Sequence, residues 1–106
     1  MSSIHASRWR SVSSDAILWR EWNSEFVVRN ERSGNTHLLG LLAGRVLQVL
    51  VEADGDLGVG EIALRLGERW PGELGSRAAD SPDRRAAIAE VLSEFRRLGL
   101  AECEAR

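Results

Sequence analysis

Apolar and polar residues alternate with a period of two in the first part of the chain, which is typical of half-buried β-strands. The alternation predicts strands over 16–22 and 25–30, joined by a turn at Asn23-Ser24. A third strand is predicted over 35–39, after a turn that ends at Gly34. Because both connections are short, the three strands are expected to form an antiparallel meander.

After these strands the apolar residues recur at the spacing of an amphipathic helix. The first such stripe predicts a helix that Gly55 ends, and its members are Leu42, Val46, Val49, Leu50 and Ala53. A second stripe runs from Leu57 to Trp70 and stops before Pro71, as the residue that precedes a proline disfavours helical angles.

A third helix carries start and stop signals at both of its ends. Ser81 can cap it, Pro82 suits its first position and Gly99 stops it. Its apolar stripe is Ile88, Val91, Leu92, Phe95 and Leu98. The predicted order is βββααα, an α+β fold in which a meander packs against a three-helix bundle, as in winged helix-turn-helix domains. Residues 1–13 are expected to be an irregular lead, 14–102 the domain and 103–106 a C-terminal tail.

Composition limits the classes of protein to which the chain can belong. Its 106 residues suit one domain, and its net charge of −2, with all 14 basic residues Arg, argues against a uniformly basic nucleic-acid binder. No apolar run reaches the roughly 20 residues that span a membrane, and the first residues lack the apolar region of a secretory signal. A single cysteine, Cys103, excludes an intramolecular disulfide, so we expect a cytoplasmic protein.

No catalytic or metal-binding motif is evident. Gly58-Val59-Gly60 lacks the Gly-Lys-Ser/Thr that completes a phosphate-binding loop, so it is interpreted as a turn. His5, His37 and Cys103 have no metal-ligand spacing to one another. The sequence therefore predicts no enzyme activity, no cofactor and no metal.

The aromatic residues and His37 leave alternatives open. Trp19 and Trp22 have opposite strand parity, so at most one faces the core, and the other rings are expected to cover helix ends or contact a partner. Trp70 is expected in the core. Three of the four Trp rings, Trp9 among them, fall at or before the first predicted strand, so the sheet is where an unusual surface is expected. His37 is expected to make either a structural hydrogen bond or a peptide contact.

Several short motifs along the chain form a recognisable set. They are Trp19-Arg20-Glu21-Trp22, Phe26-Val27-Val28, Ser33-Gly34-Asn35-Thr36-His37-Leu38-Leu39, Ala43, Val46-Leu47, Glu61-Ile62-Ala63 and Leu98-Gly99-Leu100. Together they resemble the PqqD family of small peptide chaperones, over roughly residues 8–102. Within that family, the Thr-His-Leu-Leu stretch after a Ser-Gly turn is similar to the subgroup found in HPr-kinase-related (HPr-rel-A) systems. Where the subgroup often has an acidic residue after the two leucines, this chain has Gly40.

The resemblance implies a noncatalytic peptide-recognition element for ribosomally synthesised precursor peptides. In the family, the leader segment of the precursor adds as a strand beside the third strand, lies against the third helix and is presented to a modifying enzyme. The subgroup adds an HPr-kinase-related protein as a partner. Mapped onto this chain, the implied peptide-binding residues are Asn35, Thr36, His37, Leu38, Leu39, Arg84, Ile88, Val91 and Phe95.

Two other functions fit the same topology. A winged-helix DNA-binding regulator would place a helix in the major groove, but acidic residues on or near the third helix would face phosphates. They are Asp80, Asp83, Glu90 and Glu94. Of these, Asp83, Glu90 and Glu94 are expected to pair with Arg84-Arg85 and Arg96-Arg97, unless those Arg bind an acidic leader or DNA. An adaptor that docks only onto a partner enzyme is the other alternative. A homodimer through a sheet edge also stays open.

Overall fold

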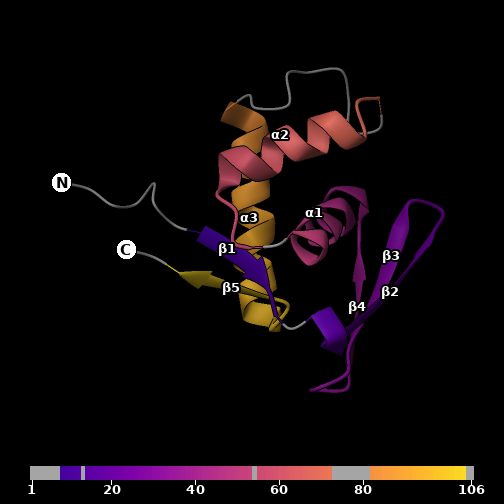
Figure 1. The fold of residues 1–106 in the computed structure, drawn as a ribbon. Coiled ribbons are helices and arrows are strands. Elements are labelled where there is room, and N and C mark those ends of the chain that lie inside the picture. The colour runs from indigo at the N-terminus through magenta and orange to yellow at the C-terminus, as the bar shows by residue number, and fades with distance from the viewer. Residues whose placement is uncertain (1–7, 13, 54, 73–81, 105–106) are drawn as a thin grey trace.

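The computed structural model describes residues 8–12, 14–53, 55–72 and 82–104. The described elements, in chain order, are β1 (Arg8–Ser11), the short 3-10 helix η2 (Ser14–Ala16), β2 (Ile17–Trp22), β3 (Glu25–Asn30), β4 (Asn35–Leu39), α1 (Leu41–Glu52), α2 (Val59–Arg69), α3 (Pro82–Leu98) and β5 (Ala101–Glu104) (Figure 1). The predicted α+β fold, a three-stranded meander followed by helices, is confirmed.

The meander has the strand order β2-β3-β4, and both pairs of neighbours are antiparallel. Asn23 and Ser24 have φ angles of 52° and 64°, the left-handed values that a two-residue hairpin turn requires. Gly34, with φ 75°, completes the turn into β4. The alternation of β3, in which Phe26 and Val28 are buried, turns one face of the sheet toward the helices.

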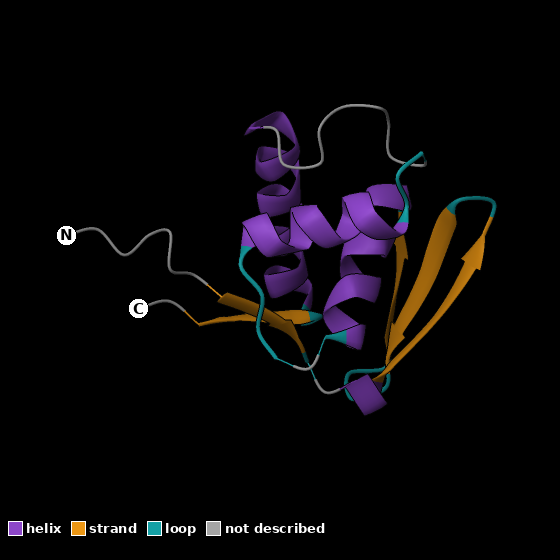
Figure 2. Cartoon of the chain, turned by 45° about the horizontal axis from the view of Figure 1, so that its top comes forward, coloured by secondary structure: helices purple, strands orange, loops and turns teal. Residues whose placement is uncertain are grey.

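The expected irregular lead and C-terminal tail need correcting. Residues 8–11 form β1 and residues 101–104 form β5, and the two strands pair antiparallel in a second sheet. Trp9 also exchanges two backbone hydrogen bonds of 2.8 Å with Leu57, ahead of α2. Strands this short have too few positions to show a period, and they form because distant segments pair. Figures 1 and 2 show α1 between the two sheets.

The helices end where the sequence indicates, but the interpretation of Gly58-Val59-Gly60 as a turn is wrong, because Gly58 is the N-cap of α2 and Val59 and Gly60 lie in its first turn. Glu61 accepts a hydrogen bond of 2.9 Å from the Gly58 N–H, which closes the first turn of α2. Gly99, with φ 78°, ends α3, and the next residue, Leu100, donates to the Phe95 carbonyl at 2.8 Å. The Ser81 cap predicted for α3 lies outside the described residues.

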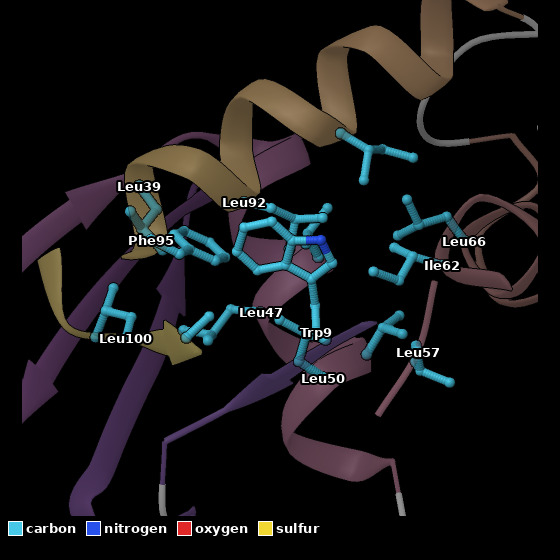
Figure 3. Close-up of a cluster of buried hydrophobic side chains, with 14 of the residues drawn as sticks. Trp9, Leu39, Leu47, Leu50, Leu57, Ile62, Leu66, Leu92, Phe95 and Leu100 are labelled. Carbon is cyan, nitrogen blue, oxygen red and sulfur yellow. The ribbon is translucent and has the colours of Figure 1, made fainter. Parts of the chain in front are cut away.

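One hydrophobic core joins both sheets to the three described α-helices. Trp9 from β1 is 8% exposed and lies among leucines and isoleucines of the helices (Figure 3). Trp19 is half-buried against Phe26, with ring centroids 5.5 Å apart, whereas Trp22 is 69% exposed. Trp70, expected in the core, is half-buried at its rim. The most deeply buried tryptophan therefore comes from the segment expected to be irregular.

Candidate functional site: the free edge of β4

Strand β4 is an edge of its sheet, and no strand in the described part of the chain pairs with its outer side. The direction of its backbone groups follows from the register. The Glu31 N–H donates to the Ala16 carbonyl at 2.6 Å, and antiparallel hydrogen bonds alternate from that pair along β2 and β3. Residues 26, 28 and 30 consequently bond to β4, where their partners are 39, 37 and 35. The N–H and C=O groups of Thr36 and Leu38 therefore point to the free edge.

Side chains of β4 alternate between two rows. The outer row holds Thr36 and Leu38, both exposed, and Leu38 is 68% accessible. The inner row faces the helices and holds Asn35, which is exposed, His37, which is half-buried, and Leu39, which is buried. The predicted strand 35–39 thus supplies an open backbone edge and one exposed apolar side chain.

Helix α3 contributes two kinds of residue to the predicted site. Ile88 and Phe95 are 0% and 1% exposed, so they belong to the core and have no surface for a ligand, which corrects their expected place in the wall of a groove. Arg84 and Val91, one or two turns away on the same face, are half-buried and keep accessible surface. Phe95 and Leu39 share the buried cluster and are drawn at the same end of it (Figure 3). This cluster joins β4 to α3.

Asn30 holds the end of β3 and the turn into β4 in place. This role was not identified from the sequence. The side-chain NH₂ of Asn30 donates to the Gly99 carbonyl at 3.1 Å, which ties the end of β3 to the end of α3. Its side-chain oxygen accepts from the backbone N–H groups of Arg32 at 2.9 Å and Ser33 at 3.4 Å, which shapes the turn into β4. An Asn at the end of a strand and before a turn is the signal in the sequence, but its bond to Gly99 follows only from the tertiary fold.

The ring of His37 has a polar atom without a partner. Nε2 is buried and makes no hydrogen bond in the described part of the chain. Val28, which lies opposite His37 on β3, is fully buried and offers no polar side chain. The alternative of a structural hydrogen bond is therefore not realised at this nitrogen.

The outer face of the sheet carries several exposed apolar side chains. Leu18 and Val27 are 55% and 44% exposed, and Val27 lies opposite Leu38. A shallow hollow of about 360 Å³ is lined by Leu18, Trp19, Arg20, Val27 and Arg29. Contiguous exposed apolar side chains are typical of surfaces that another molecule covers.

On the inner side of the sheet, the buried Arg45 side chain connects β2 to α1. Arg45 from α1 makes two hydrogen bonds of 3.0 Å to the Glu21 carboxylate and one of 3.1 Å to Gln48. Its guanidinium lies 5.2 Å from the Phe26 ring centroid and 4.8 Å from that of Trp70. Sequence reasoning missed Arg45, because a lone Arg within an apolar helix carries no signal of its partner on a distant strand.

The described residues hold no group of three His, Cys, Asp or Glu side chains placed to bind a metal ion. None of the helices in the described ranges is both long and apolar enough to cross a membrane. On the exposed side of α3, Glu94 accepts from Arg97 at 2.8 and 2.9 Å, the pairing expected for these charges. The feature that stands out is thus a strand edge rather than a cluster of reactive side chains.

Comparison with known proteins finds similarity at the level of structure. Neither a family model nor a curated protein matches the chain. The structure of TbiB1 in complex with the TbiA(beta) leader peptide superposes with a TM-score of 0.62 at 17% identity, over 88% of this chain and 94% of that one. A lasso peptide synthetase B1 complexed with the leader peptide gives a TM-score of 0.60 at 18% identity, over 89% and 96%. At these identities the likeness establishes a shared fold.

Proposed function

We propose that this chain is a noncatalytic peptide chaperone that binds the leader segment of a ribosomally synthesised precursor peptide by strand addition to β4. The observation that carries the proposal is the open edge of β4, along which Thr36 and Leu38 direct backbone donors and acceptors outward. The shared fold with two leader-peptide complexes supports it.

The geometry explains how an edge strand can hold a peptide without chemistry. The backbone N–H and C=O groups of Thr36 and Leu38 offer two donors and two acceptors at the free edge. These groups fix the register of an added strand, but they do not distinguish one peptide side chain from another. Specificity comes from the side chains of the two rows, with Asn35, His37 and Leu39 on the inner face and Thr36 and Leu38 on the outer face. The outer face stays uncovered, so a modifying enzyme can reach the complex there.

The partner and the location follow from the same proposal. We place the protein in the cytoplasm, where precursor peptides are made, with a peptide-modifying enzyme as its second partner. The Ser33-Gly34 turn and the Thr36 to Leu39 motif support the HPr-kinase-related subgroup, and an HPr-kinase-related protein is the candidate for that partner. Co-purification of the two proteins from one host tests this finer assignment.

Calorimetric titration tests leader binding. The ligands are synthetic leader segments of the short reading frames that neighbour the gene, with the TbiA(beta) leader as a second probe. We expect one-to-one binding that is insensitive to salt. Absence of binding at about 100 μM for every cognate leader contradicts the proposal. Salt-dependent binding of duplex DNA in the same titration would favour the winged-helix alternative instead.

Replacing Leu38 by Pro is expected to weaken leader binding at least about tenfold, because Pro lacks the N–H that points to the free edge. The ladder to β3 stays intact, since position 38 does not bond to β3, and Pro is tolerated on such edges. Leu38→Ala is the matched control for loss of the side chain. Unchanged affinity of a folded Leu38→Pro variant would show that the peptide binds elsewhere.

Two truncations on α3 test whether Val91 contacts the peptide and Ile88 belongs to the core. Val91→Ala is expected to lower leader affinity while the free energy of unfolding falls by about 1 kcal/mol, because Val91 is half-buried. Ile88→Ala is expected to cost about 2–5 kcal/mol of stability, because Ile88 is fully buried. Urea unfolding and calorimetry measure both effects. Equal stability losses would argue that Val91 is also core.

A further inference from the structure

We propose that His37 selects the bound peptide by requiring a short hydrogen-bonding side chain, Ser, Thr, Asn or Asp, opposite it in the added strand. The inference rests on the proposed strand addition at β4. Its starting point is the buried Nε2 atom, which has no hydrogen-bond partner among the described residues. Buried polar atoms are nearly always bonded, and leaving one unpaired costs free energy that a ligand with a complementary group can recover.

The register places the partner directly beside the ring. Residue 37 bonds through its backbone to β3, so in an added antiparallel strand the residue opposite His37 occupies a position without cross-strand hydrogen bonds. At such positions the Cα atoms are only about 4.5 Å apart and the side chains are closest. The side chain opposite His37 points toward the helices, as His37 itself does, and a short polar group suits that separation.

Rotation of the ring can bring the nitrogen to the ligand. The χ2 torsion of His is broad and two-fold, and a half-turn exchanges the positions of Nε2 and Cε1 without moving the backbone. A neutral imidazole has one donor and one acceptor nitrogen. Hydroxyl and amide groups can donate to the acceptor nitrogen or accept from the donor nitrogen. A carboxylate can only accept, and it therefore needs the nitrogen that carries the hydrogen.

Neighbouring residues confine the requirement to one position. Val28 lies on the opposite side of β4 from the added strand and is fully buried, and Leu39 further along the inner row is buried and apolar, so neither residue requires a polar partner in the peptide. Asn35, at the other end of the row, is exposed and can be served by water. A polar residue is therefore required of the peptide only opposite His37.

The test selects peptides from a displayed library of random 14-residue sequences on the wild-type chain and on His37→Leu. We expect wild-type selections to carry Ser, Thr, Asn or Asp at one fixed position, and His37→Leu selections to carry apolar residues there with the rest of the pattern kept. In calorimetry, a selected peptide should lose about tenfold in affinity for the wild-type chain when that residue becomes Ala, the effect of one hydrogen bond to a buried group. The same change should alter affinity for His37→Leu less than about twofold.

Stability provides a second readout. His37→Leu removes the unpaired atom, so its melting temperature is expected to rise, whereas His37→Asn keeps a polar group and should retain part of the peptide preference. Identical preferences of the two chains at every position overturn the inference and leave leader binding standing. Peptides bound through the β4 edge should lose affinity for a Leu38→Pro variant. If every selected peptide binds Leu38→Pro as well as the wild-type chain, the proposed strand addition is wrong, and the role of His37 is wrong with it.

Discussion

Gly44→Ala should lower the free energy of unfolding by about 3 kcal/mol, the upper end of the cost of overpacking a core. A Cβ atom at this position of α1 would overlap the ring of Phe26. That ring is 1% exposed, and it is held between Trp19 and the Arg45 guanidinium, so it has no room to retreat. Chemical unfolding followed by circular dichroism measures the loss.

Gly60→Ala is the matched control, because it also replaces a glycine within a helix. Its Cβ would meet only the Arg85 guanidinium, at 3.0 Å, the movable end of a flexible side chain. Alanine is favoured over glycine in helices, so Gly60→Ala should be neutral or stabilising by up to about 1 kcal/mol. If the two variants were equally stable, the close approach of α1 to Phe26 would be wrong.

Trp9→Ala should cost about 3–5 kcal/mol, most of the stability of a small domain. The ring is 8% exposed and fills the space between β1 and the helices, while its backbone is bonded to Leu57 (Figure 3). Its loss leaves a cavity and removes the apolar anchor of β1. We expect a fall in melting temperature of roughly 10 °C or more, measured by calorimetry.

Trp22→Ala is the counterpart for an exposed ring. At 69% exposure, this side chain buries little surface, so its truncation should change stability by less than about 0.5 kcal/mol. The pair therefore tests burial rather than residue type. A Trp9→Ala variant as stable as Trp22→Ala would show that β1 does not pack on the core in solution.

Local patterns predicted most of the fold because its main elements are locally specified. Alternation in β3 and the Pro82 and Gly99 signals of α3 need no knowledge of the partner element. The pairing of β1 with β5 joins Arg8 to Glu104, at opposite ends of the chain, and such pairs leave no local period. The contact of Arg45 with Glu21 could not be predicted for the same reason, because the two residues lie on different elements.

The strand that forms the candidate site could be predicted from the sequence, whereas the burial of the α3 residues could not. Position on an edge strand follows from the order of three short-linked strands, so residues 35–39 could be predicted as a free edge, and their contact with a peptide stays a prediction. The stripe of α3 identified Ile88 and Phe95 as apolar, but a periodic pattern does not distinguish the buried centre of a helix face from its accessible flank. Burial separates them from Val91, because depth depends on how α1 and α3 pack.

The antiparallel pairing of β1 with β5 brings Arg8 opposite Glu104, on the side of the helices away from β4 (Figure 1). A second protein fused to either end would therefore leave the Thr36 and Leu38 edge accessible. A short linker between the two ends would likewise allow a circular permutant, with new termini in a surface loop, that retains the edge. The geometry thus allows the domain to exist as a separate protein or to be joined to another protein, with the β4 edge accessible in both cases.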